Sequence, residues 1–288
     1  MYDYRIYTPL PDFKITDEII TCAILSDLAY LDIDVFLLKW NQCKNSNVIE
    51  SKEETINYYI ERDYYINKIF NKITETPIIY NGLLNPNIYK DTQAFFIKMK
   101  DIQYITFRGT ENIFDLFADL NITKVQFEDF KNVMVHRGFY MQFLSIKNEI
   151  IKDIALNKQI ILTGHSLGGA VATLTSVYIA NLYPEVDITL ITYACPKIGN
   201  QAFAELFKKT ILKNFRFVTE EDVIPIIAAT FDYVQVSDAY CIKEKQVLKQ
   251  ENDVHWMLAL YHALFKSLFY MHSCNTYIST LFSLLKSS

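Results

Sequence analysis

A serine between two glycines is the feature of this sequence with the clearest chemical meaning. Gly164 and Gly168 flank Ser166 at two positions on either side, within the segment IILTGHSLGGAVATL (160–174). An apolar β-type run precedes the serine and a helical run follows it, which is the context of a nucleophile elbow. A strand that turns abruptly into a helix strains the backbone of the central serine and brings its neighbours too close for side chains. The pattern therefore predicts a serine hydroxyl at the carboxyl edge of a sheet, beside a helix N-terminus that favours negative charge.

The segments around this serine alternate between strands and helices. Runs of β-type residues predict strands, and apolar positions three or four residues apart predict helices. This alternation is typical of a mostly parallel sheet in a three-layer α/β fold. Strands are expected at 94–99 and 102–107, which form a hairpin, and at 159–164, 187–194, 214–219 and 232–242. Helices are expected at 16–31, 51–72, 139–155, 167–182, 201–212, 254–271 and 275–286.

The chain shows no internal repeat, low-complexity segment or linker along its 288 residues. With 51% apolar residues it can bury one sizeable core. The apolar stretch from His255 to Met271 is interrupted by Lys266 and is too short to span a bilayer comfortably, so a buried helix is expected there. We therefore predict one α/β domain over residues 1–288, with 1–75 as an N-terminal helical region packed on it.

Charge and cysteine content argue against several classes of protein. The 28 basic and 33 acidic residues give a net charge of −5 without a basic stripe, so nucleic acid is not expected as a partner. The five cysteines form no C-x-x-C pair, which argues against a metal knuckle or a disulfide framework. The N-terminal stretch MYDYRIYTPL lacks the features of a secretory signal. Reduced thiols and a cytoplasmic location are the expectation.

Five blocks of the sequence resemble the class 3 lipases, the fungal-lipase-like branch of the α/β hydrolases. They are FRGT (107–110), VHRGFY (135–140), GHSLGG (164–169), YACPKIGNQAFA (193–204) and FRFVTEEDVIPII (215–227). Six of the seven glycines fall inside these blocks, which follow the family's order. The resemblance covers about 107–227 and implies an α/β-hydrolase fold, with a mostly parallel central sheet flanked by helices.

The resemblance also implies a nucleophile and an acid. Ser166 corresponds to the family's nucleophile, and Asp222, in EEDVIP, corresponds to its acid. The alternative for Asp222 is a solvated loop carboxylate, with Glu220 or Glu221 equally well placed. The base must come later in the chain, because this fold orders its triad Ser, Asp, His.

Three histidines follow the acid. His272, in MHSCNTYI, resembles the family's histidine, which is followed a few residues later by an aromatic residue and a final helix. His255 and His262 lie seven residues apart on one face of the preceding helical stretch, where a structural role is more usual. The expected triad is therefore Ser166, Asp222 and His272.

The family's oxyanion hole implies two further residues. Thr110 can offer its backbone N–H and its hydroxyl to the oxyanion, and the N–H of Leu167 is the second donor. The alternative for Thr110 is a structural threonine at a strand end. Three other residues in the blocks are expected to be structural: His165 points away from the serine hydroxyl, His136 lies near the floor of the site, and Arg108 anchors its strand through a carboxylate.

Residues 112–120 (NIFDLFADL) lie where lipases of this family carry a short amphipathic lid. Asp115 and Asp119 fall on one side of the helix that this segment could form. Its apolar face consists of Ile113, Phe114, Leu116, Phe117 and Leu120. Such a face suits an acyl chain or a lipid–water interface, and the alternative is that it packs on the protein core.

The expected function is that of a serine esterase or lipase, which hydrolyses carboxylic esters of lipids through an acyl-enzyme. No metal constellation is visible in the sequence and no cofactor is expected. The expected partner is a glyceride or phospholipid ester, met peripherally at a membrane or lipid-droplet surface. Two alternatives stay open: an acyltransferase that uses the same acyl-enzyme, and a catalytically silent lipid-binding module. Substrate choice and oligomeric state are not decided by the sequence.

Overall fold

The computed structural model of the chain describes most of its residues. They are 7–10, 12–45, 58–82, 92–110, 123–220, 222, 224–225, 232–243, 246–250 and 272–287. Among these residues, no helix is both long and apolar enough to cross a membrane.

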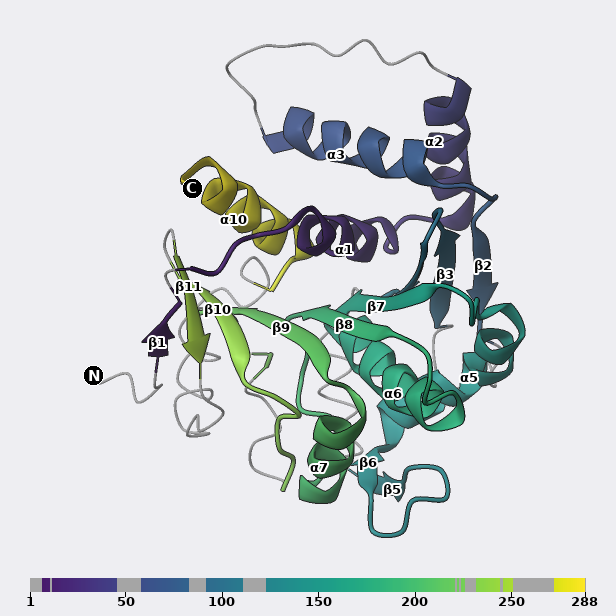
Figure 1. Ribbon diagram of the computed structural model, residues 1–288, viewed down its shortest axis with the longest axis vertical. Helices are drawn as coiled ribbons and strands as arrows, with labels where there is room; N and C mark the ends of the chain where they lie inside the picture. Colours follow the sequence, from purple (N-terminus) through teal and green to yellow (C-terminus); the bar gives the residue numbers. More distant parts are fainter. Residues whose placement is uncertain are drawn as a thin grey trace.

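A nine-stranded sheet forms the centre of the molecule (Figure 1). Its strands lie in the order β1 (Tyr7–Pro9), β11 (Gln246–Gln250), β10 (Ala239–Lys243), β9 (Lys213–Thr219), β8 (Ile188–Tyr193), β7 (Gln159–His165), β4 (Ile102–Phe107), β3 (Gln93–Lys98) and β2 (Ile78–Asn81). Neighbouring strands from β4 to β10 are parallel, and the strands at both edges are antiparallel. The mostly parallel sheet that the sequence predicts is confirmed.

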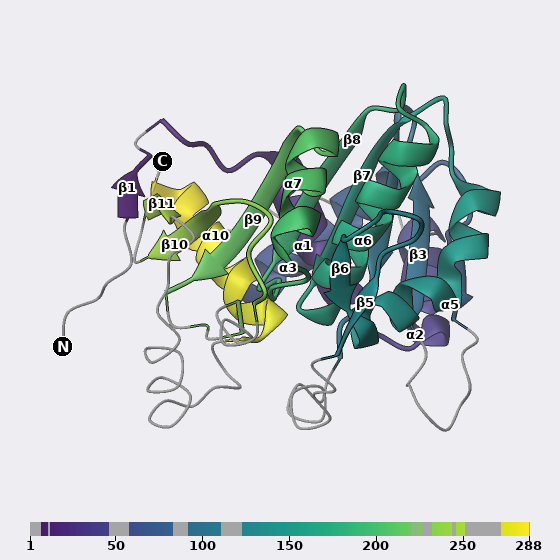
Figure 2. The same ribbon diagram turned by 90° about the horizontal axis from the view of Figure 1, so that it is seen from below.

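Helices cover both faces of this sheet, as Figures 1 and 2 show from two directions. One face carries α1 (Asp17–Leu28), α3 (Tyr58–Lys72) and α10 (Cys274–Ser287), with α2 (Ile33–Asn45) against α3. The other face carries α5 (Arg137–Asp153), α6 (Leu167–Leu182) and α7 (Gln201–Thr210), near the small sheet of β5 (Lys124–Gln126) and β6 (Met134–His136). Each face buries its own hydrophobic cluster, so the central strands are apolar on both sides.

The structure differs from the sequence-based expectations at several elements, and the strands β1, β2, β5, β6 and β11 were not expected. Helix α2 was not expected, although apolar residues at positions 33, 36, 37 and 40 follow helical spacing and would have indicated it. The last strand was expected at 232–242, but only β10 pairs in the sheet there. The preceding segment is held elsewhere: Val234 forms a bridge with Gly199, and Arg216 donates to the carbonyl of Ser237. The expected helix at 254–271 lies outside the described residues.

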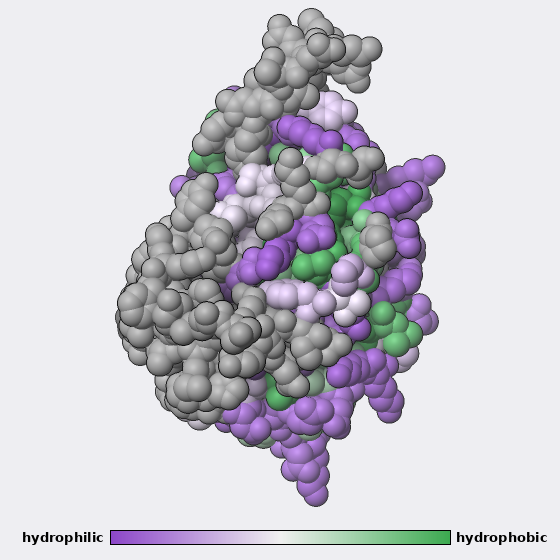
Figure 3. Space-filling model, turned by 90° about the vertical axis from the view of Figure 1, so that its left-hand side faces the viewer, coloured by the Kyte–Doolittle hydropathy of each residue, from purple (hydrophilic) through white to green (hydrophobic). Residues whose placement is uncertain are grey.

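The side of the molecule that carries β1 is drawn in Figure 3. The described surface there is largely hydrophilic, and its hydrophobic residues gather mainly near the centre of this view. That residues 1–288 form one domain, with 1–75 packed on it, stays a prediction.

Candidate active site

Ser166 lies at the turn between β7 and α6. Its backbone has φ 57° and ψ −124°, which an L-residue adopts only when the surrounding structure enforces it. The amide N–H of Ser166 donates to the carbonyl oxygen of Tyr193 on the neighbouring strand β8, at 2.9 Å. This geometry is that of the elbow that the sequence predicts.

The two glycines that flank Ser166 are needed because backbone segments approach each other closely there. A Cβ atom at Gly164 would lie 2.4 Å from the carbonyl carbon of Gly168. A Cβ atom at Gly168 would lie 2.1 Å from the carbonyl oxygen of Phe107, at the end of β4. Such distances are well inside van der Waals contact, so the first turn of α6 can pack against β4 only because both residues lack a side chain.

Asp222 lies just past the end of β9 and is 3% exposed. Its Oδ1 atom accepts a hydrogen bond from the backbone N–H of Ile224 at 2.9 Å. Both carboxylate oxygens lie 3.0 Å from Nδ1 of His272. The alternative of a solvated loop carboxylate is therefore wrong for Asp222, whereas Glu220 is half-buried and pairs with Lys243 at 2.8 Å.

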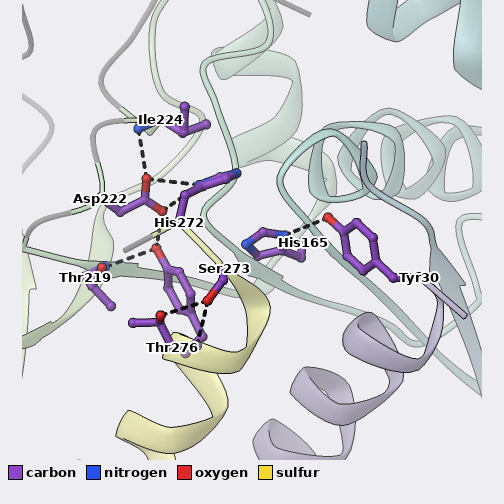
Figure 4. A network of polar contacts seen from close by, with 9 residues as sticks. Tyr30, His165, Thr219, Asp222, Ile224, His272, Ser273 and Thr276 are labelled. Carbon is purple, nitrogen blue, oxygen red and sulfur yellow. Dashed lines mark hydrogen bonds and ion pairs between the residues drawn. The ribbon is translucent and has the colours of Figure 1, made fainter. Parts of the chain in front are cut away.

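His272 lies two residues before α10, whose first turn is capped by the Ser273 hydroxyl (Figure 4). With Nδ1 bonded to the Asp222 carboxylate, the neutral ring presents Nε2 as an acceptor. Within the described part of the chain, Nε2 of His272 and Oγ of Ser166 are both buried and form no hydrogen bond. Hydrogen bonds between a nucleophile and its base are often long before substrate binds. The carboxylate of Asp222 thus orients the ring of His272, whose Nε2 atom is available to accept a proton.

A residue that the sequence analysis did not single out forms a further hydrogen bond with the acid, Asp222. Tyr277, on α10, is fully buried and donates from its hydroxyl to Oδ2 of Asp222 at 2.7 Å. The same hydroxyl accepts from the N–H of Thr219 at 3.2 Å. Burial, together with the charge of Asp222, raises the pKa of Tyr277 well above its usual value, so the hydroxyl stays a donor. The sequence analysis expected an aromatic residue after His272, but it assigned no role to that residue.

The two residues predicted for the oxyanion hole lie beyond the ends of adjacent strands. Phe107, the last residue of β4, pairs with Gly164 of β7 in parallel register. Thr110 follows β4 by three residues and is half-buried, and Leu167 is the buried first residue of α6. Parallel strands end at the same edge of the sheet, so Thr110 and Leu167 lie on the Ser166 side of it.

The three block residues that were expected to be structural each have a defined partner. His165 bonds to the Tyr30 hydroxyl through Nδ1 at 2.9 Å, and its ring centre lies 4.7 Å from that of His272. His136 caps α5 by accepting from the N–H of Gly138 at 3.1 Å, and burial lowers its pKa to about 4. Arg108 donates to the side-chain oxygen of Gln93 on β3 at 3.0 Å.

Several predicted site residues lie outside the described residues. These are the lid residues Ile113, Phe114, Leu116, Phe117 and Leu120, and the two rival histidines His255 and His262. Over the ranges that the structure describes, no group of three or more His, Cys, Asp or Glu side chains is arranged to hold a metal ion.

Comparisons with known proteins bear on the family and the fold of this chain. Residues 104–231 match the sequence model of the lipase (class 3) family. The chain is 32% identical over 127 residues to the toxin TseL of Vibrio cholerae, and 29% identical over 154 residues to a lipase of Rhizomucor miehei. These stretches cover 43% and 49% of this chain, but only 20% and 42% of the relatives. The chain therefore spans less than half the length of these curated relatives.

Solved structures show the same fold over a larger part of the chain. The triacylglyceride lipase of Rhizomucor miehei superposes with a TM-score of 0.67 at 22% identity, covering 90% of this chain and 96% of that one. The lipase of Rhizopus microsporus var. chinensis also gives 0.67, at 21% identity, with coverage of 93% and 91%. At such identities the likeness concerns the fold, which confirms the predicted α/β-hydrolase architecture. The central segment, residues 104–231, thus resembles the class 3 lipase family, and the fold around it is that of the α/β hydrolases.

Proposed function

We propose that this protein is a serine esterase of the lipase type, which hydrolyses carboxylic esters of lipids through Ser166, Asp222 and His272. The observation that carries the proposal is the buried pair of Asp222 and His272, with Nε2 of the histidine left as an acceptor. It is supported by the strained elbow that holds Ser166 at the edge of the sheet. Together these groups are the parts that acyl transfer by a serine requires.

The proposed reaction begins with attack of Ser166 Oγ on the ester carbonyl, as Nε2 of His272 takes the hydroxyl proton. The Asp222 carboxylate stabilises the imidazolium that forms. The backbone N–H groups of Thr110 and Leu167 hold the oxyanion, since donors fixed in advance stabilise charge that develops in the transition state. The alcohol leaves with the proton from His272, and water then releases the acid from the acyl-enzyme by the same route.

The substrate class is inferred from the relatives and from the sequence. Among the similar proteins are a triacylglyceride lipase of Rhizomucor miehei and a secreted mono- and diacylglycerol lipase of Penicillium cyclopium, which is 30% identical over 146 residues. We propose a glyceride or phospholipid ester as the substrate of this chain. The lid at 112–120, action at a membrane or lipid-droplet surface and a cytoplasmic location stay predictions from the sequence.

Covalent labelling by a fluorophosphonate tests the nucleophile directly. Wild-type protein should be labelled at one site, and Ser166→Ala should lose both labelling and esterase activity, by more than about a thousandfold, without a change in melting temperature. Ser176→Ala is the matched control, because this buried serine lies on α6, the helix that follows Ser166, and donates to the carbonyl of Thr173. An active Ser166→Ala protein would refute the proposal.

Product analysis separates the proposed hydrolase from its alternatives. A panel of p-nitrophenyl esters of increasing acyl length, followed by glyceride and phospholipid emulsions, measures the substrate class. Added glycerol should leave free fatty acid as the main product, whereas new glyceride would indicate an acyltransferase. A protein that binds these lipids but reacts neither with esters nor with the fluorophosphonate would be a silent lipid-binding module.

A further inference from the structure

Helix α1 and the turn that follows it each make one polar contact with the nucleophile strand β7. Ser26 Oγ lies 3.1 Å from the hydroxyl of Thr163, and both residues are fully buried. Four residues later, the Tyr30 hydroxyl lies 2.9 Å from Nδ1 of His165. Tyr30 lies two residues beyond the end of α1, and Thr163 and His165 lie on the same face of β7 because side chains alternate along a strand. The segment that runs from α1 to Tyr30 therefore lies alongside the last residues of β7, just before Ser166.

The Tyr30 hydroxyl also touches the strand that leads to the predicted oxyanion hole. A Cβ atom at Gly109 would lie 2.1 Å from this oxygen and 2.7 Å from the carbonyl oxygen of His165. Gly109 is buried and directly precedes Thr110. The hydroxyl of Tyr30 thus occupies the space beside Gly109 that any other residue would need for its side chain. It lies between the oxyanion segment and the nucleophile strand.

His165 links Tyr30 to the base, His272, through contacts between their rings. Its ring lies between that of Tyr30, which it meets edge-on at 5.9 Å between centres, and that of His272, which is tilted against it at 4.7 Å. Figure 4 shows the three rings in this order, with Asp222 on the far side of His272. Burial, and then the nearby His272, lowers the pKa of His165 well below its usual value, so the ring is neutral and offers one donor and one acceptor. A tyrosine hydroxyl can satisfy either role.

From these contacts we infer that Tyr30 is a positioning residue, which holds the Gly109–Thr110 segment and the His165–His272 ring pair in their reactive places through its hydroxyl. This inference rests on the proposed function. The N-terminal helix is then part of the apparatus that sets the reaction geometry and has a role beyond covering the sheet. A shift of about 1 Å in a reacting group can cost about a hundredfold in rate, so one hydroxyl at this position has a measurable effect.

The test compares Tyr30→Phe with Ser26→Ala. Each change removes one hydroxyl that joins the α1 segment to β7, but only Tyr30 touches Gly109 and His165. With a short soluble ester, Tyr30→Phe should lower kcat by about tenfold and leave KM within about twofold, because the change affects the positions of the reacting groups. Ser26→Ala should leave kcat within about twofold while lowering the melting temperature at least as much. The rate of fluorophosphonate labelling should follow kcat in both variants.

The outcomes distinguish this inference from the proposed function. If wild-type protein is labelled and Tyr30→Phe is labelled at the same rate, Tyr30 has no positioning role, whatever happens to the melting temperature. If both variants lose rate equally, docking of α1 is what matters and the specific role of Tyr30 is refuted. If wild-type protein is neither labelled nor active, the proposed function fails, and the role of Tyr30 fails with it.

Discussion

The two sides of the candidate site are built in different ways. The elbow around Ser166 is one short stretch of chain, shaped by backbone atoms that approach within distances where a side chain does not fit. On the acid–base side, side-chain hydrogen bonds join Asp222 to His272 and Tyr277, which follow it by 50 and 55 positions in the sequence. Side chains added at the elbow glycines should therefore disturb folding and activity together, whereas damage to the acid–base side should reduce activity in a protein that still folds.

The largest effect is expected at the acid. Asp222→Asn keeps the shape of the side chain but removes the charge and one acceptor, so His272 is no longer held in the tautomer that accepts a proton at Nε2. In serine hydrolases such a change costs about 10⁴-fold in kcat, and a loss of this order is expected here. Steady-state kinetics on a soluble ester, with circular dichroism to confirm folding, measures it.

Glu220→Gln is the control for this change, because Glu220 lies two residues away and pairs with Lys243 at the half-exposed end of β9. Its kcat should stay within about twofold of wild type, as expected for the loss of a weak surface ion pair. Equal losses in the two variants would show that the strand end, and not the acid itself, is sensitive.

An intermediate effect is expected at the elbow glycines. Gly168→Ala would place a methyl group 2.1 Å from the carbonyl oxygen of Phe107, so α6 and β4 must move apart. We expect a loss of about 3 kcal/mol in the free energy of unfolding, typical of overpacking, with a parallel loss of kcat. Urea denaturation measures the first and ester turnover the second.

Gly169→Ala is the matched change one residue later on the same helix. Its nearest contact would be 3.1 Å, to the carbonyl oxygen of Gly164, so a smaller shift accommodates the methyl group. It should be clearly less destabilising than Gly168→Ala. A stable but inactive Gly168→Ala protein would contradict the view that the elbow is limited by packing.

The smallest effect is expected at Tyr277. Tyr277→Phe removes one of the donors to the Asp222 carboxylate but keeps the buried ring, so kcat should fall by roughly tenfold or less, the equivalent of one hydrogen bond to a charged group. Tyr193→Phe is the control, because this equally buried tyrosine donates to the carbonyl of Ile19, away from Asp222. Similar melting temperatures with kcat reduced only in Tyr277→Phe would support the role assigned to this hydroxyl.

Much of the sheet and of its flanking helices can be predicted from local patterns. The strand, turn and helix from 159 to 182 follow from apolar periodicity and from two glycines, and the structure has β7 and α6 there. The hairpin of β3 and β4 follows in the same way. The strand expected at 232–242 shows the limit of this approach. Its β-type residues are partly held by Gly199 and Arg216, far away in the sequence, which no local pattern reveals.

The sequence by itself determined the elbow, because a tight strand–helix turn is a property of consecutive residues and their allowed backbone angles. The resemblance to a family indicated Asp222 as the acid and His272 as the base, but it did not indicate which residues hold them in place. Only the tertiary structure decided that Tyr277 donates to the acid and that Tyr30 lies against Gly109 and His165. Tyr30 and His165 are 135 positions apart. Such partnerships depend on how α1 and α10 pack on one face of the sheet, and packing is a property of the whole chain.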